Sequence, residues 1–403
     1  MIPQNWEKHP VGKLCSSIVP GRNKPKFFNG NIPWVTTPEI QGRYIPSKLQ
    51  VNYVSECALL EAGGKVVPQG AVVIAAVGDL GLVAIASEPV VLNQQLHAFV
   101  CSELVNNEYL AYWLATQKPY MESIASKTTI PYMNKANCES IPVLVPPLSE
   151  QKKIAQILST WDKAISTTEQ LLTNSQQQKK ALMQQLLTGK KRLLDNNGVR
   201  FSGEWPEAKL ADLVYRPLCY GVLKPGENVS GGHPLIRIQD LNETDELDQT
   251  TLIRISDELH QEFKRTILNV GDLIMSIVGT LGKVFSIPES LQGANITRAF
   301  AVIGAMEGKI NPSFLRQYLV SSKIQEWLES TATGNAQKVL NISAIKDLLI
   351  PIPCLEEQHK IAAVLSIADQ EITALQQKLA ALRQEKKALM QQLLTGKRRV
   401  TVN

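Results

Sequence analysis

The stretch Ala181-Leu182-Met183-Gln184-Gln185-Leu186-Leu187-Thr188-Gly189-Lys190 occurs twice in this chain, the second time as residues 388–397. The offset of 207 residues continues without a gap over a longer window. In this window residues 148–192 align with residues 355–399, and 26 of the 45 aligned pairs are identical. A repeat of this length and separation indicates that the chain of 403 residues is built twice.

Within each repeat, apolar residues recur at alternating steps of four and three, the heptad pattern of a helix that packs against a partner helix. Gly189 and Gly396 follow the two patterns as helix C-caps. Each helix would have roughly 38 residues and extend about 57 Å. We predict that the two helices form an antiparallel coiled coil through Ile154, Leu158, Trp161, Ile165, Leu172, Leu182 and Leu186 of the first and Ile361, Leu365, Ile372, Leu375, Leu379, Leu382, Leu389 and Leu393 of the second.

Two lysines, Lys179 and Lys386, interrupt this apolar seam at equivalent places in the two repeats. One hypothesis is that their aliphatic stems lie along the seam edge while the ammonium groups reach water. The other is that the two charges help to set the register of the helix pair.

The segments that precede the helices also repeat a common framework, with an offset of 201 residues. Residues 234–241 align with residues 33–40, the glycine-bounded strand pair from Gly271 aligns with that from Gly70, and Ala299-Phe300 aligns with Ala98-Phe99. Residues between these points differ almost completely. The predicted fold is therefore α+β, with two pseudo-symmetric α/β-type domains separated by the two helices, and the predicted segments are 1–147, 148–195, 196–354 and 355–403.

The composition is that of an ordinary globular protein, with 44% hydrophobic and 20% charged residues. A net charge of +5 permits a polyanionic partner without demanding one. The six cysteines stand singly, which favours reduced thiols in a cytoplasmic protein. We expect no secretion signal and no membrane span.

Patterns that could carry catalysis are weak in this sequence. Gly279-Thr-Leu-Gly-Lys-Val284 resembles part of a phosphate loop, but Ile277 stands where that pattern needs its first glycine, so a glycine turn is the better interpretation. Glu262 and Lys264, with Asp240 or Asp248 upstream, only loosely resemble a nuclease carboxylate cluster. The five histidines lack the spacing of a metal site or a catalytic triad. We predict that the chain is not an enzyme and binds no metal.

Two similar lobes with different loops suit a protein that reads two different DNA half-sites, because successive turns of the double helix are about 34–36 Å apart. Base edges are read by arginine, lysine, amide and hydroxyl side chains, and phosphates by lysine and arginine. Such residues gather in the loop-rich parts of both lobes. The candidate DNA contacts are Arg22, Lys24, Lys26, Thr36, Thr37 and Arg43 in the first lobe and Lys224, Arg237, Gln239, Lys283, Asn295, Thr297, Arg298, Asn335, Gln337 and Lys338 in the second.

Several of these motifs together resemble the specificity (S) subunit of Type I restriction-modification systems. The similarity rests on residues 141–154 (I-P-x-x-x-P-P-L-S-E-Q-x-x-I), their partner at residues 348–361, the duplicated ends of the helices, and the G-D-L-I-x-S-x-x-G-x-x-G-K strand pair of residues 271–283. It covers essentially the whole chain. The first copy of the strand pair departs from the pattern, with Ala71 for the aspartate and Leu82 for the lysine.

The resemblance implies two target-recognition domains that each read one half of a bipartite, asymmetric double-stranded DNA site. It implies that the helix pair sets the spacer length and docks two methyltransferase (modification) subunits, which carry S-adenosylmethionine and methylate adenine. Restriction (translocase) subunits would add ATP- and magnesium-dependent cleavage, so this chain would hold no cofactor. The alternatives are a non-catalytic coiled-coil scaffold that joins protein partners, and an enzyme whose site is not recognised.

Overall fold

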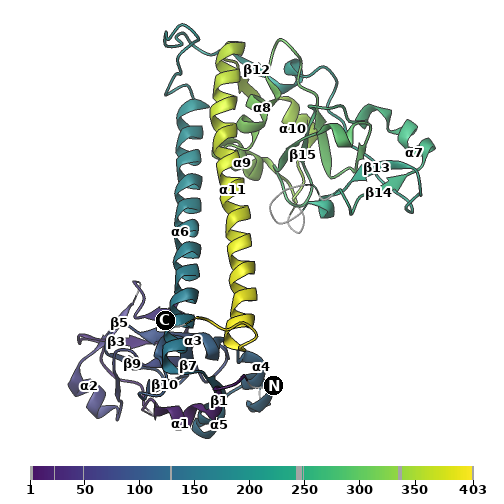
Figure 1. The fold of residues 1–403 in the computed structure, drawn as a ribbon. Coiled ribbons are helices and arrows are strands. Elements are labelled where there is room, and N and C mark those ends of the chain that lie inside the picture. Colours follow the sequence, from purple (N-terminus) through teal and green to yellow (C-terminus); the bar gives the residue numbers. More distant parts are fainter. Residues whose placement is uncertain are drawn as a thin grey trace. The chain divides into compact units, whose positions relative to one another are not determined.

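The computed structural model of this protein describes residues 3–21, 23–48, 50–127, 129–241, 247, 249–334 and 338–401. These residues form two compact units (Figure 1). One unit contains Met1–Glu169 and Gln377–Asn403, and the other contains Gln170–Gln376. Each unit therefore combines one lobe (lobe one, residues 3–147; lobe two, residues 205–354) with half of each long helix.

The two long helices are α6 (Leu148–Leu186) and α11 (Leu355–Leu394), and they pack together as predicted. In the first unit, Lys386 of α11 bonds to Asp162 of α6, while Arg383 pairs with Glu169 at 2.6 Å. Because the residue number falls along one helix as it rises along the other, the two halves run antiparallel. In the second unit the same order holds, since Ser175 bonds to Glu371 at 3.1 Å and Lys179 to Asp369 at 2.5 Å.

Every seam position predicted from the heptad pattern is buried or half-buried in the helix pair. The two ends of the seam are fully covered, because Ile154, Leu158 and Leu393 belong to the core of lobe one, while Ile361 and Leu365 belong to the core of lobe two. Each lobe is thus joined to the helices by a continuous apolar core.

The described residues of lobe one form two sheets, a short two-stranded ribbon and five short α-helices. The five-stranded sheet has the order β2 (Cys15–Ile18), β10 (Leu96–Cys101), β7 (Val72–Ala75), β8 (Val83–Ala86) and β4 (Tyr44–Ile45). The four-stranded sheet has the order β5 (Asn52–Val54), β3 (Ile32–Val35), β9 (Val90–Leu92) and β6 (Val66–Val67). The ribbon pairs β1 (Glu7–Pro10) with β11 (Pro142–Val145), and the helices are α1 (Val11–Leu14), α2 (Glu56–Glu61), α3 (Asn107–Ala115), α4 (Lys118–Ile124) and α5 (Lys135–Ser140).

Lobe two has the same arrangement of two sheets and a ribbon, with fewer strands in each sheet. One sheet has the order β14 (Ile253–Ile255), β13 (His233–Ile236) and β17 (Asn295–Ile296), and the other has the order β16 (Val284–Ser286), β15 (Leu273–Ser276) and β18 (Phe300–Ile303). The ribbon pairs β12 (Glu207–Lys209) with β19 (Leu349–Pro351). The helices are α7 (Asp257–Glu262), α8 (Pro312–Leu319), α9 (Ser322–Thr331) and α10 (Ile342–Lys346). The described residues also include the 3-10 turns η1 (Thr37–Glu39) of lobe one and η2 (Leu210–Leu213), η3 (Ile238–Asp240), η4 (Lys264–Thr266) and η5 (Glu289–Leu291) of lobe two.

Strand pairing confirms the 201-residue offset for part of the lobe framework and corrects it for the rest. Val72 pairs with Ile85 in lobe one as Leu273 pairs with Ser286 in lobe two, which keeps the offset at 201. The next strands do not keep it. Phe99 pairs with Val72, whereas the residue opposite Leu273 is Ile303, so the offset has become 204. The alignment of Ala98-Phe99 with Ala299-Phe300 is therefore wrong, because lobe two has three more residues, including η5, before β17.

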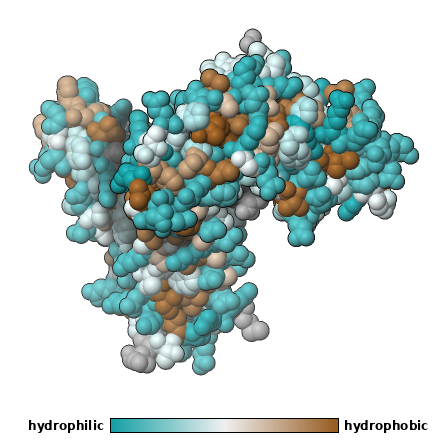
Figure 2. Space-filling model, turned by 90° about the horizontal axis from the view of Figure 1, so that it is seen from above, coloured by the Kyte–Doolittle hydropathy of each residue, from teal (hydrophilic) through white to brown (hydrophobic). Residues whose placement is uncertain are grey.

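The surface in Figure 2 is mostly hydrophilic, and its hydrophobic side chains gather in small groups. Among the residues that the structure describes, no helix is both long and apolar enough to cross a membrane.

Candidate nucleic-acid interface

In lobe one, the carboxyl ends of two neighbouring parallel strands bring polar side chains together. β3 and β9 run parallel, with Val35 opposite Leu92, and the backbone N–H of Asn93 continues the pairing by donating to the Val35 carbonyl at 3.0 Å. Thr36 and Thr37 follow the first strand, and Asn93, Gln94 and Gln95 follow the second. The Thr37 hydroxyl donates to the Gln95 amide oxygen at 3.2 Å, so the two loops meet at this edge.

Lobe two forms the corresponding edge from β13 and β17. The N–H of Thr297 donates to the Ile236 carbonyl at 3.0 Å, which is the equivalent of the Asn93 bond in lobe one. Arg237 and Gln239 follow β13, and Thr297 and Arg298 follow β17. The chain near Lys224 joins them, because Arg298 N–H donates to the Val222 carbonyl at 2.9 Å. Five of the predicted DNA contacts of lobe two thus lie around one strand edge.

The two edges share a backbone corner but carry different side chains on it. In lobe one the Thr36 N–H and hydroxyl both donate to Glu39, at 2.7 and 2.8 Å. In lobe two the Arg237 N–H donates to Asp240 at 2.8 Å, and its guanidinium holds the same carboxylate at 2.6 Å. The hydrogen bond that its guanidinium donates to Asp240 raises the already high pKa of Arg237, so this arginine remains charged. Most hydrogen bonds of Thr36 and Arg237 therefore stabilise the backbone corner itself.

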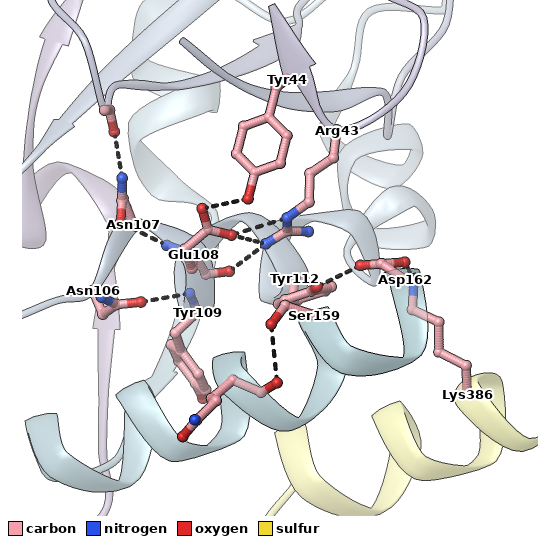
Figure 3. Close-up of polar contacts among 12 residues, drawn as sticks. Arg43, Tyr44, Asn106, Asn107, Glu108, Tyr109, Tyr112, Ser159, Asp162 and Lys386 are labelled. Atoms are coloured by element: carbon pink, nitrogen blue, oxygen red, sulfur yellow. Dashed lines mark hydrogen bonds and ion pairs between the residues drawn. The ribbon is translucent and has the colours of Figure 1, made fainter. Parts of the chain in front are cut away.

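Arg43 is held inside lobe one rather than presented to solvent (Figure 3). Its guanidinium donates to the Glu108 carboxylate at 2.8 and 3.0 Å, donates to the Glu108 carbonyl at 2.8 Å, and stacks 3.4 Å above the Tyr112 ring. Tyr44 also donates to Glu108, at 2.9 Å. Arg43 therefore fixes the loop around β4 against α3, and its position argues against the predicted direct DNA contact.

The prediction that Asn295 contacts DNA is wrong for the conformation described. Its side chain is fully buried, and its amide oxygen lies 2.6 Å from Nδ1 of His260, which stacks on His233 with ring centroids 3.6 Å apart. Because Asn295 stands within β17 rather than after it, its side chain packs beneath the edge that Thr297 and Arg298 form.

The remaining candidates differ in how accessible they are. Lys24, Lys26, Lys224, Gln239 and Arg298 are exposed, whereas Thr37, Thr297 and Lys283 are half-buried. Lys338 is exposed and lies 3.4 Å from Glu329. Arg22, Asn335 and Gln337 lie outside the described residues.

Asn93, Gln94 and Gln95 were not among the contacts predicted from the sequence. An offset of 201 places Thr297 and Arg298 opposite Leu96 and His97, which are buried in β10. The observed offset of 204 places them opposite Asn93 and Gln94. The sequence could have indicated them, because three polar residues in a row directly follow the apolar residues of β9.

At each end of the helix pair, a buried glutamate joins the helix start, the end of the other helix and the lobe. Glu150 accepts two bonds from Arg399, at 2.7 and 2.8 Å, and one from the Trp6 indole at 3.1 Å. Burial raises the pKa of Glu150, but the bonds from Arg399 and Trp6 outweigh it and leave the pKa below its usual value.

Glu357 has the equivalent partners in the second unit. It accepts two 2.7 Å bonds from Arg192 and one of 3.1 Å from the Trp205 indole. The same glutamate–arginine–tryptophan contacts therefore recur at an offset of 207 residues. The glutamate of the repeated Glu-Gln pair not only starts each long helix but also attaches the lobe to it, a role called an anchor below.

The glutamine of that pair is also an anchor. Gln151 is fully buried, accepts the Asn106 N–H at 2.8 Å and donates to the carbonyls of Leu104 and Pro146 at 3.0 and 2.8 Å. Gln358 does the same in the second unit, accepting from Asn311 at 2.7 Å and donating to the carbonyls of Lys309 and Pro353 at 3.3 and 2.9 Å. The N-terminus of α3 in lobe one and that of α8 in lobe two are thus each attached to the start of a long helix by a buried amide side chain whose hydrogen bonds are all made within the protein.

Lys179 and Lys386 form ion pairs within the helix pair, so their ammonium groups do not simply reach water. Lys386 binds Asp162, which also accepts the Tyr112 hydroxyl (Figure 3). Lys179 binds Asp369 at 2.5 Å, and Gln317 donates to that carboxylate at 2.6 Å. A seam charge that finds its partner only at one helix position favours a single register, as the second hypothesis requires.

The weak catalytic patterns have structural explanations. Residues 279–283 lie in the turn between β15 and β16, and Val284 begins β16. Asp240 is the last residue of η3 and accepts the Arg237 N–H, while Asp248 is outside the described residues. Over the described ranges, no group of three or more histidine, cysteine, aspartate or glutamate side chains is placed to hold a metal ion.

Comparisons with known proteins agree with the duplicated architecture. Residues 3–174 and 204–384 each match the family model described as the Type I restriction modification DNA specificity domain. The EcoBI specificity subunit of Escherichia coli is 30% identical over 302 residues, which cover 70% of this chain and 63% of that protein. The MjaVIII specificity subunit of Methanocaldococcus jannaschii is 24% identical over 99% of this chain and 94% of that protein.

A solved structure shares the fold over nearly the whole length. The S subunit of a Type I restriction-modification system from M. genitalium aligns with a TM-score of 0.63 and 15% identity, covering 96% of each chain. The duplicated family match, together with the strand edges and helix anchors that occur once in each unit, leads to one conclusion: the chain belongs to the Type I restriction modification DNA specificity family.

Proposed function

We propose that this chain is the sequence-reading subunit of a Type I restriction-modification complex, in which each lobe reads one half of a bipartite double-stranded DNA site. The observation that supports this most directly is the pair of equivalent strand edges. They keep one backbone corner, in which Thr36 and Arg237 bind Glu39 and Asp240, but carry Asn93 and Gln94 in lobe one against Thr297 and Arg298 in lobe two. Amide, hydroxyl and guanidinium groups are the side chains that distinguish base edges.

The helix pair would act as the ruler between the half-sites and as the docking surface for two methyltransferase subunits. Support comes from apolar side chains that the seam does not use, among them Leu171 and Ile367, which are 47% and 64% exposed. Apolar groups outside the seam of a coiled coil are suited to burial against a further partner. The scaffold alternative has no support from the comparisons and does not account for two strand edges with different polar residues.

Catalysis and cofactors would reside in the partners. We propose that S-adenosylmethionine is bound by the methyltransferase subunits, and ATP and magnesium by the restriction subunits, while this chain catalyses nothing and acts in the cytoplasm, where the DNA is. The comparisons place the chain among specificity subunits, which is the basis for this division of labour.

Methylome sequencing tests the proposal. A host that expresses the partner methyltransferase with this chain should gain one bipartite methylated-adenine motif, which a host without the chain lacks. Exchanging lobe two for that of another family member should change one half of the motif and keep the other. If co-expression leaves the methylome unchanged, the proposed function fails.

A further inference from the structure

The edge of lobe one carries a small pocket with an apolar wall and amide groups at its rim. Its volume is about 280 Å³, and it is lined by Lys24, Phe28, Trp34, Thr36, Asn52, Asn93, Gln94 and Gln95. It therefore lies at the carboxyl ends of β3 and β9, where the candidate DNA contacts of this lobe gather. A pocket of this size admits the edge of one base rather than a base pair.

The apolar wall is made by two aromatic rings. Phe28 packs edge-on against Trp34, with centroids 5.8 Å apart and an interplanar angle of 66°. Trp34 lies opposite Asn52 in the β3–β5 pair, so both side chains occupy the same face of the sheet. The wall therefore offers an apolar contact directly beside an amide.

Gln95 supplies hydrogen-bond donors at the rim. Its amide oxygen accepts from both the Thr37 hydroxyl, at 3.2 Å, and the Asn93 amide, at 3.1 Å. Both lone pairs of this oxygen are thus used, which leaves the amide nitrogen, with two hydrogens, as the group that can bind an incoming acceptor. The rim therefore presents donors next to an apolar wall.

Thymine matches this combination. In the major groove it is the one base of unmodified DNA that shows a methyl group, and it shows this methyl beside the acceptor O4. The exposed Lys24 lines the pocket and brings a positive charge that complements a phosphate next to such a base. Lobe two has Leu235, Thr297 and Arg298 at the positions of Trp34, Asn93 and Gln94, so the same feature is not repeated there.

Building on the proposed function, we propose that this pocket reads a thymine in the half-site of lobe one, with the 5-methyl group against Phe28 and Trp34 and O4 bound by the Gln95 amide. The half-site of lobe one then contains at least one A·T pair. Discrimination there depends on the methyl group as well as on hydrogen bonding.

The experiment uses the chain assembled with its methyltransferase subunits, and duplexes that carry the methylated motif. Each thymine of the motif is replaced in turn by 2′-deoxyuridine, which lacks only the methyl group. One replacement should weaken binding by about fourfold, the equivalent of roughly 0.8 kcal/mol for one buried methyl. Phe28→Ala should abolish this difference between thymine and uracil. The matched control is Phe27→Ala, because Phe27 is 62% exposed and does not line the pocket.

Two outcomes would overturn the pocket assignment: a motif with no uracil-sensitive thymine, or a Phe28→Ala complex that keeps the full difference between thymine and uracil. If Phe28→Ala does not fold, Gln95→Ala at an exposed position serves instead, and it should weaken binding to thymine-containing and uracil-containing duplexes equally while the methyl effect persists. Loss of the methyl effect, or unchanged binding, would count against the assignment. If the complex methylates a bipartite motif but no thymine-to-uracil replacement weakens binding, only the pocket assignment fails. If the complex methylates no bipartite motif, the proposed function fails.

Discussion

Lys386 of α11 forms an ion pair with Asp162 of α6, although the two residues are 224 positions apart in the chain. The same carboxylate accepts the Tyr112 hydroxyl of α3, so one aspartate joins both long helices and lobe one. Asp369 repeats this role with Lys179 and Gln317. The register of the helix pair and the seating of each lobe on it are therefore held by shared groups.

Replacing Lys386 with methionine should destabilise the first unit by about 1–3 kcal/mol, because the partly buried Asp162 would lose its ammonium partner and keep the Tyr112 hydroxyl. Denaturant unfolding of the purified protein measures the change. Lys387→Met is the control, since Lys387 is exposed and should change stability by less than about 0.5 kcal/mol. Equal effects of the two substitutions would contradict the importance of the ion pair.

Stability should fall in acid partly through Asp369. Burial raises the pKa of this group, but the bonds from Lys179 and Gln317 outweigh burial and lower the pKa below its usual value. A carboxyl with a lowered folded-state pKa stabilises the fold above its unfolded pKa of about 4, and this contribution disappears as the pH falls further. Unfolding midpoints measured from about pH 6 down to pH 3 should therefore depend less steeply on pH in Asp369→Asn than in the parent. Asp347→Asn is the control, because this exposed carboxylate pairs with Lys209 at 2.7 Å on the surface, where an ion pair contributes little, and it should change the slope less than Asp369→Asn does.

Arg43 and Lys26 should behave differently although both were candidate contacts. Arg43→Ala leaves Glu108 without its guanidinium partner and should lower the stability of lobe one by about 1–3 kcal/mol, while the salt dependence of DNA binding stays the same. Lys26→Ala should leave stability unchanged and reduce the slope of log affinity against log salt by about 0.9, as expected for one lost phosphate contact. Binding titrations of the assembled complex at several salt concentrations distinguish the two results. A reduced slope for Arg43→Ala would mean that Arg43 contacts DNA.

Arg298 should be a base-reading residue of lobe two, because it is exposed at the strand edge and has no side-chain hydrogen-bond partner among the described residues. Arg298→Ala should weaken binding to the methylated motif by about 1–3 kcal/mol and relax specificity at one position of one half-site. Arg254→Ala is the matched control, since that guanidinium donates to the Gly232 carbonyl at 2.7 Å. Competition binding against a panel of single-base variants gives the readout, and a uniform loss across the panel would identify a phosphate contact instead.

The ruler role predicts a specific response to lengthening the helices. One heptad inserted after Leu172 in α6 and another after Gln377 in α11 keeps the seam in phase and adds about 10 Å at 1.5 Å per residue. The methylated motif should gain about three base pairs of spacer, at 3.4 Å per base pair, and keep both half-site sequences. An insertion at Thr188-Gly189 is a poor test, because it would disturb the end of α6. Gly189 has a φ of +69°, and a Cβ added there would lie 3.7 Å from the Trp205 ring. Altered half-site bases in the heptad variant would argue against a ruler.

The sequence predicted the parts of this fold whose signals are local and periodic. The heptad pattern located both helices and their buried face, and glycine-bounded apolar runs located β7 with β8 and β15 with β16. Gly189 and Gly396 both have the positive φ expected of helix C-caps. These features depend on neighbouring residues in the chain, so one sequence is enough to find them.

The candidate site was only partly predictable because its side chains are placed by distant residues. Nothing near Arg43 in the sequence indicates that its partner is Glu108, which is 65 positions later. The burial of Asn295 depends on His260, and the three extra residues before β17 hid the equivalence of Asn93 with Thr297. Residue type alone therefore indicated the loops at the strand edges but could not separate exposed side chains from internal anchors.

The anchors have a consequence for how such proteins diversify. Because Gln151 and Gln358 make the same three kinds of bond, and Glu150 and Glu357 meet the same arginine and tryptophan partners, each helix start offers the same attachment to whichever lobe it holds. A lobe moved by recombination from one half of a gene to the other would find its attachment already in place. New combinations of half-sites could then arise by exchanging modules, without any new interface having to evolve.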